Sequence, residues 1–186
     1  MAQSIFNQRQ LPSTHFLESS GAILFDISRP QKRICLVHYL KAQQWLLAKG
    51  RRNCNESRLS AALREVTEET GYKCRAFPVT MATRATGLDE VADVRDEARV
   101  YEGLVEPFMV TLREGSGVGV KFIWWFVAVL DEGGEEWRGE GEKGFEACFF
   151  EVEDAVEKLF FESDREVLKR AVELVDATLK SRGHCQ

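Results

Sequence analysis

The chain of 186 residues lacks the long apolar segments that membrane and secreted proteins need. Its longest apolar run, FIWWFVAVL at residues 122–130, has nine residues, whereas a membrane-spanning helix needs about 20. The opening MAQSIFNQRQLPSTHF has no apolar segment of the kind found in secretory signal peptides. We therefore expect a cytoplasmic protein that does not insert into a membrane.

Cysteine and histidine are too sparse for several other kinds of site. The five cysteines are scattered and form no C-x-x-C pair, which favours free thiols over a disulfide framework or a zinc site. Nothing in the sequence pairs His15 or His38 with a nucleophile, so a Ser/His/Asp arrangement is not expected. The chain also lacks repeats, low-complexity tracts and Pro/Ser-rich linkers, and its length fits one domain.

Positive charge is not in excess. The formal net charge of -5 argues against a general nucleic-acid-binding protein, which would normally carry a basic stripe or a basic balance. It leaves room for a small polyanionic substrate, because local clusters of charge decide that question. We expect no nucleic-acid partner.

The pattern of apolar residues predicts strands interleaved with a few helices. Strands are expected at 21–25, 33–40, 44–50, 76–83, 108–112 and 120–130. A short helix is expected at 151–159 and a final helix up to about residue 181, with Ser163 and Glu166 at capping-box spacing. Such interleaving predicts an α/β sandwich with a mixed sheet.

Other parts of the chain are less regular. Residues 1–19 are polar and are expected to form an N-terminal arm ahead of a single domain at 20–183. Residues 87–103 are charged and ambiguous, and 131–144 are expected to be an exposed loop. Trp124 and Trp125 should point to opposite faces of their strand; both are expected in the core, although one could stack on a base.

The segment 56–70 predicts an amphipathic helix that ends at Gly71. Glu65, Glu68 and Glu69 cover one arc of roughly 100° beside its apolar stripe. Like charges at this spacing repel one another and weaken a helix, so a bound cation is one explanation. Hard carboxylate oxygens suit Mg²⁺ or Mn²⁺. The alternative is an ordinary solvated acidic face.

The residues around this helix favour the metal site. Gly50 is followed after five residues by Glu56, and after seven more by the run REVTEETGY, residues 64 to 72. This pattern resembles the signature of the Nudix hydrolase family and matches it in every fixed letter. Only Tyr72 departs from it, where an aliphatic residue is more usual. The resemblance implies a Nudix-type α/β/α sandwich with a mixed sheet.

The resemblance also implies roles for individual residues. In the family, glutamates matching Glu65, Glu68 and Glu69 bind the metal ion, assisted by the carbonyl of the glycine matching Gly50. Residues matching Arg64 and Glu56 form an ion pair that orients these ligands, a support that metal sites generally need.

The implied reaction is the attack of metal-activated water on phosphorus in a nucleoside diphosphate linked to another group. A further carboxylate from a later loop often assists in the family. Glu142 and Glu146 are both candidates, because their loop contains several glutamates.

The substrate is less defined. Lys49, Arg51 and Arg52 flank Gly50 and favour a polyphosphorylated ligand, although such residues also simply keep a loop soluble. Residues 20–160 look similar to the diphosphoinositol polyphosphate phosphohydrolases, which also cleave diadenosine polyphosphates. Two departures are Ala48, where a proline is common, and the segment 84–119, a longer stretch that we interpret as an insertion.

Two alternatives remain open for the function. One is a Nudix-fold sensor that binds a phosphorylated ligand without cleaving it. The other is a hydrolase of another nucleoside diphosphate-linked substrate, such as capped RNA. The sequence does not indicate the oligomeric state.

Overall fold

The computed structural model describes residues 7–87, 94–115 and 119–183. Strand β1 (Phe16–Asp26) lies inside a mixed sheet, parallel to β9 (Gly119–Leu130) and antiparallel to β2 (Arg33–Tyr39). The path through the sheet is β10-β2-β1-β9-β5, where β10 is Phe145–Glu151 and β5 is Cys74–Ala76. Three further strands pair with this path: β3 (Gln44–Leu46), β4 (Lys49–Arg51) and β8 (Met109–Gly115).

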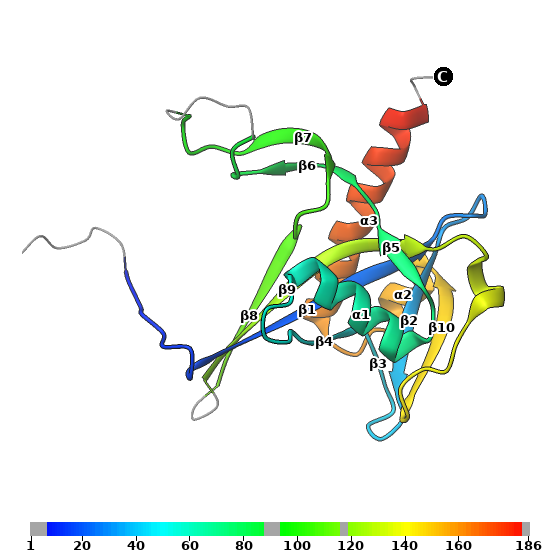
Figure 1. Ribbon diagram of the computed structural model, residues 1–186. Helices are drawn as coiled ribbons and strands as arrows, with labels where there is room; N and C mark the ends of the chain where they lie inside the picture. Colours follow the sequence, from blue (N-terminus) through cyan, green and yellow to red (C-terminus); the bar gives the residue numbers. More distant parts are fainter. Residues whose placement is uncertain (1–6, 88–93, 116–118, 184–186) are drawn as a thin grey trace, which may run out of the picture.

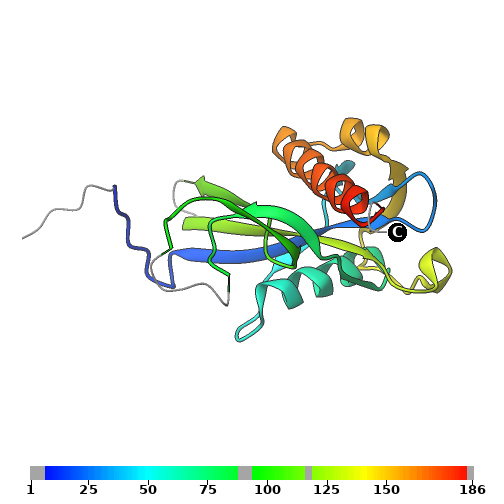
Figure 2. The ribbon, with the colours of Figure 1, turned by 90° about the horizontal axis from the view of Figure 1, so that it is seen from above.

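Helices cover both faces of this sheet. Helix α1 (Arg58–Thr70) lies on one face, and α2 (Val152–Lys158) and α3 (Glu162–Gly183) lie on the other, as Figures 1 and 2 show. The predicted α/β/α sandwich with a mixed sheet is therefore confirmed. Among the described residues, no helix is long and apolar enough to cross a membrane.

The alternating directions of the side chains along β1 explain why the protein has one hydrophobic cluster on each face of the sheet. Ala22 and Leu24 pack in a cluster with the apolar stripe of α1, whereas Ile23 and Phe25 pack in a second cluster with α2 and α3. Successive side chains of a strand point to opposite faces, so a strand that is apolar throughout is buried on both sides. The predicted strand pair of 21–25 and 33–40 is confirmed by the β1–β2 ladder.

The glutamate-bearing helix α1 has well-defined ends. Ser57 caps it, accepting a hydrogen bond from the backbone N–H of Ser60. Gly71, with φ of 76°, ends it in the left-handed conformation that glycine adopts readily, as predicted. The helix starts two residues later than the expected 56, because Glu56 lies before the cap.

Two sequence predictions need correction, and one strand was not anticipated. The capping box is wrong, because α3 begins at Glu162 and Ser163 therefore lies within its first turn. Strand β10 was not anticipated; it pairs with β2 and follows the loop at 131–144. Strand β1 begins at Phe16, inside the range expected for the polar arm.

The segment 84–119 contributes strands to two sheets. Strand β7 (Arg99–Leu104) pairs with β6 (Val79–Thr83) in a separate two-stranded sheet, and β8 joins the main sheet beside β9. The β6–β7 pair lies beside α3, where the Thr80 N–H donates to Thr178 Oγ1 at 2.9 Å. Parts of this segment, 88–93 and 116–118, lie outside the described residues.

Candidate active site

Strand β4 brings Gly50 against the middle of α1. The packing is so close that a Cβ atom at position 50 would overlap the Glu65 carboxylate. One residue away, the Lys49 backbone N–H donates to Glu69 Oε2 at 3.1 Å. Glycine is therefore required here by close approach, and the strand aligns two of the three predicted metal ligands.

Two of the three glutamates are buried. Glu65 is 9% exposed and Glu69 is 8% exposed, whereas Glu68 has a half-exposed side chain. Burial raises the pKa of Glu69 from its ordinary 4.5 to about 7, and nearby Glu65 and Glu142 add to this. Burial also raises the pKa of Glu65. Buried carboxylates of this kind are uncommon in a solvated acidic face and indicate a functional site.

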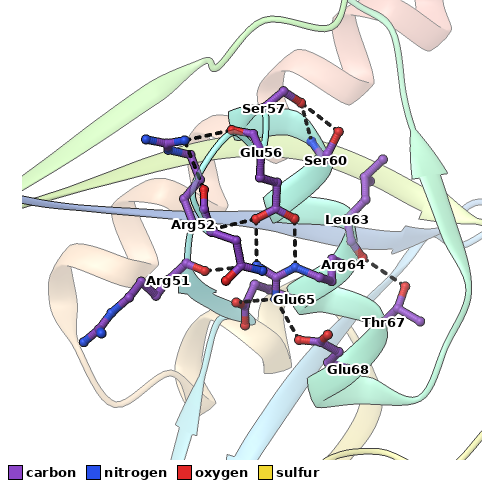
Figure 3. Close-up of polar contacts among 11 residues, drawn as sticks. Arg51, Arg52, Glu56, Ser57, Ser60, Leu63, Arg64, Glu65, Thr67 and Glu68 are labelled. Carbon is purple, nitrogen blue, oxygen red and sulfur yellow. Dashed lines mark hydrogen bonds and ion pairs between the residues drawn. The ribbon is translucent and has the colours of Figure 1, made fainter.

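Arg64 connects the glutamates, as Figure 3 shows. Its guanidinium donates to both carboxylate oxygens of Glu56, at 2.8 and 3.0 Å. It also donates to Glu65 at 2.7 Å, to Glu68 at 2.8 Å and to the Arg51 carbonyl at 3.0 Å. Side-chain hydrogen bonds from Arg64 lower the pKa of Glu56 to about 2. The predicted Arg64–Glu56 pair is thus present and holds α1 against β4.

The structure separates the two candidates for a further carboxylate. The Glu142 N–H donates to the Glu68 carbonyl at 2.8 Å, and the charge of Glu142 contributes to the raised pKa of Glu65 and Glu69. Glu146 lies on β10, exposed and opposite His38. No hydrogen bond or ion pair among the described residues links it to the three glutamates. Glu142 is the better placed of the two.

The three basic residues around Gly50 do not stay together. Lys49 and Arg51 lie opposite Gly21 and Ser19 of β1, on the α3 face of the sheet. Arg52 lies on the α1 face instead, where its Nε donates to Glu18 at 3.0 Å and its Nη1 to the Glu56 carbonyl at 2.9 Å.

Glu18, which no sequence pattern indicated, organises the α1 face. Its carboxylate accepts hydrogen bonds from Arg52, from Arg58 and from the Trp124 indole at 3.0 Å. Arg58 also lies 3.9 Å from the centre of the Trp124 ring. A cleft of about 510 Å³ opens beside Glu18, Arg52 and Arg58 but contains none of the three predicted metal ligands. A single acid in a polar lead-in carries no sequence signal for this role.

The two tryptophans point to opposite faces, as predicted. Trp125 is fully buried on the α3 side, where its indole donates to Thr111 at 2.9 Å. Trp124 is only partly buried and packs against the α1-side cluster. Core packing is confirmed for Trp125. The indole N–H of Trp124 donates to Glu18, and its ring lies under the guanidinium of Arg58.

The donor set fits a hard divalent cation. Glu65, Glu68 and Glu69 provide oxygen atoms, and burial raises the pKa of the two buried members, whose charged form a bound cation would stabilise. Within 7–87, 94–115 and 119–183, no group of three His, Cys, Asp or Glu side chains already converges as a metal site. Arg64 donates to Glu65 and Glu68, and the Lys49 N–H donates to Glu69.

A model of the Nudix domain family matches residues 18–171 of the chain. The chain belongs to the Nudix family. Comparison with curated proteins gave no match.

Solved structures of other Nudix proteins share the fold. A Nudix hydrolase from Nitrosomonas europaea is 14% identical, with 87% of this chain and 88% of that chain covered and a TM-score of 0.54. The C. elegans Ap4A hydrolase is 15% identical, with 85% and 96% covered and a TM-score of 0.53. The Nudix domain of Shewanella oneidensis NrtR, solved with ADP ribose, is 15% identical, with 84% and 86% covered and a TM-score of 0.51. At these identities the likeness shows the fold alone.

Replacing Arg64 by lysine tests whether Arg64 holds Glu65 and Glu68 in place. Lysine keeps the charge but cannot bond Glu56 through two nitrogen atoms and still reach Glu65 and Glu68. We expect kcat/KM to fall about 10- to 100-fold, measured by phosphate release in the presence of Mg²⁺. Arg58→Lys, on the same helix but bonded to Glu18, is the control and should change activity less than threefold.

Proposed function

We propose that this Nudix protein is a Mg²⁺- or Mn²⁺-dependent pyrophosphohydrolase. The observation that carries the proposal is the pair of buried carboxylates, Glu65 and Glu69, held against the tight Gly50 strand. In this proposal Glu65, Glu68 and Glu69 hold the metal ion with the Gly50 carbonyl. When bound, the ion supplies Lewis-acid stabilisation of phosphate oxygens and lowers the pKa of a water nucleophile.

The surrounding residues then have separate tasks. Arg64 and Glu56 fix the carboxylates in place through the hydrogen bonds described above. Lys49 and Arg51 flank Gly50 on β4, and their side chains on the α3 face of the sheet bind substrate phosphates. Glu142 is the candidate for holding a proton of the attacking water, since its backbone is bonded to α1 at Glu68.

The substrate we propose first is a diphosphoinositol polyphosphate, and second a diadenosine polyphosphate. Two observations support a multiply phosphorylated ligand. One is the similarity of residues 20–160 to enzymes of that type. The other is that the side chains of Lys49 and Arg51 form no ion pair with an acid among the described residues. Capped RNA is a further candidate of the same reaction class.

A substrate panel tests the proposal. With Mg²⁺ or Mn²⁺ present, we expect either release of inorganic phosphate from a diphosphoinositol polyphosphate or cleavage of a diadenosine polyphosphate into two mononucleotides, and neither after the metal is removed by a chelator. Glu68→Gln should remove at least nine-tenths of this activity while the fold, followed by circular dichroism, is retained. Turnover of nucleoside triphosphates or ADP-ribose alone would refute the substrate assignment.

One observation favours the sensor alternative. Arg64 already pairs with both Glu65 and Glu68, and a protein that only binds its ligand could keep these ion pairs without a metal ion. If a compound of the panel binds tightly but yields no product with either Mg²⁺ or Mn²⁺, the protein is a sensor and not a hydrolase.

A further inference from the structure

Four basic side chains on the α3 face of the sheet form a group that we call the basic cluster. They come from three strands: Lys49 and Arg51 from β4, Arg113 from β8, and Lys121 from β9. Arg113 and Lys121 are direct partners in the β8–β9 ladder. Side chains of directly opposed residues have Cβ atoms about 4.5–5.5 Å apart. The sequence pointed only to the two members on β4.

The strand register places all four on one face. Lys49, Arg51 and Lys121 lie opposite the odd-numbered residues 21, 19 and 17 of β1. Odd-numbered residues of this strand share the face on which Ile23 and Phe25 pack with α2 and α3. The basic cluster therefore lies across the sheet from α1. It reaches the catalytic glutamates at β4, where the Lys49 backbone bonds Glu69.

The charge of the basic cluster is poorly compensated inside the protein. Among the described residues, no ion pair joins the side chain of Lys49, Arg51 or Lys121 to an acid, and Arg113 lies 3.7 Å from Asp164. The four side chains nevertheless affect one another, because burial and then the charges of the other three members lower the pKa of Lys121. Glu65 is the acid that opposes this shift. Gathering like charges in a partly buried place costs free energy unless an anion is bound.

The arginines on the α1 face, unlike most of the basic cluster, form ion pairs with acidic side chains. Arg52 and Arg58 share the carboxylate of Glu18, and Arg64 is bonded to Glu56. The fold thus pairs each of these arginines with an acid, whereas Lys49, Arg51 and Lys121 form no ion pair with any acid in the part of the chain that the structure describes. This contrast favours a bound anion as the partner of the basic cluster.

Two buried polar groups border the basic cluster. Asp164, in the first turn of α3, is 2% exposed, and the charges of Lys49 and Arg113 both act on it. Its Oδ2 has no hydrogen-bond partner among the described residues, and the same holds for Oγ of Ser19, which is 1% exposed and lies opposite Arg51. A carboxylate in this position draws Lys49 and Arg113 toward each other without neutralising the whole cluster.

We infer that the basic cluster binds phosphate groups of the substrate that are additional to the diphosphate being cleaved. Small molecules with such extra phosphates, on a longer chain or on a phosphorylated ring, are then preferred over those with a diphosphate alone. This inference rests on the proposed function and specifies its substrate class. Arginine and lysine at positions 113 and 121 would act as specificity-determining residues, since charge-assisted hydrogen bonds to phosphate are strong.

Binding of inorganic tripolyphosphate tests this without any hydrolysis. Isothermal titration calorimetry is done on the full chain with no divalent ion added, for wild type, Lys121→Gln and Arg113→Gln. Each variant loses one charge-assisted contact, so Kd should rise about tenfold or more, and its dependence on salt should weaken. Lys169→Gln on α3 and Arg75→Gln on β5 remove the same charges at exposed sites and should leave Kd within twofold.

Kinetics on two substrates provide the second readout. Both variants should raise KM for diadenosine tetraphosphate about tenfold with kcat nearly unchanged, and should leave KM for ADP-ribose as it is. An unchanged Kd for tripolyphosphate in both variants would overturn the inference, and so would an equal rise in the two controls. If an RNA oligonucleotide binds more tightly than tripolyphosphate and both variants weaken its binding, the ligand of the basic cluster is RNA and the inference of a small substrate is wrong. If the variants bind tripolyphosphate more weakly but the wild type turns over no substrate, the proposed hydrolase function is wrong and the phosphate-binding role of the basic cluster stands.

Discussion

Glu69→Gln is expected to reduce kcat at least about 1,000-fold. Glu69 is one of the two buried carboxylates beside Gly50, and glutamine keeps its size but provides no negative charge for a divalent ion. Metal-ion catalysis contributes several kcal/mol, and each 1.36 kcal/mol corresponds to a tenfold change in rate. Steady-state phosphate release with saturating Mg²⁺ measures the loss. Glu157→Gln, an exposed glutamate on α2, serves as the control and should retain full activity.

The same substitution should make the metal-free protein more stable at pH 8. The pKa of Glu69 is raised from 4.5 to about 7 in the folded state, so ionisation is less favourable there than in the unfolded chain. This penalty is absent below pH 4.5, grows as the pH rises and is complete above pH 7. Glutamine removes it, with an expected gain of about 1–3 kcal/mol in the free energy of unfolding at pH 8 and none at pH 4. Urea unfolding at both pH values measures the difference, and a loss of stability at pH 8 would contradict the burial argument.

The fold and the glutamate helix were predictable because their signals are local. Alternation and β-branched runs identify the strands at 21–25, 33–40 and 120–130, and an apolar stripe ending at Gly71 identifies α1. The resemblance of the segment from Gly50 to Tyr72 to the Nudix signature then implies which residues meet. The structure places Glu65 against Gly50 and Glu69 against the Lys49 backbone.

What could not be predicted depends on pairings between distant strands. Arg52 follows Arg51 in the sequence, yet alternation sends it to the opposite face, where it meets Glu18. Lys121 opens an apolar strand and gains significance only because β8 sets Arg113 opposite it. The ambiguous residues near 99–104 became a strand through pairing with β6, which no local pattern specifies.

Gly50→Ala is expected to reduce kcat/KM about 100-fold or more with little loss of stability. A Cβ atom at this position would overlap the Glu65 carboxylate. The carboxylate is the end of a side chain, so it can move aside at modest cost in folding free energy, and among the described residues its hydrogen bond comes from Arg64. Moving a catalytic group by about 1 Å can cost 100-fold in rate. Activity should therefore fall while the midpoint of urea unfolding changes little.

Gly21→Ala in the neighbouring strand is the matched comparison. A Cβ atom there would lie 2.7 Å from both Lys49 Cβ and the Trp125 ring, and also too close to the Ala48 carbonyl. Backbone and a fully buried ring cannot move aside as a carboxylate can, so the cost falls on folding, with an expected loss of about 2–4 kcal/mol. The two alanine variants should thus separate, one losing activity and the other stability. If Gly50→Ala instead unfolds the protein while Gly21→Ala is tolerated, the tight strand at Gly50 serves packing and does not position Glu65 for catalysis.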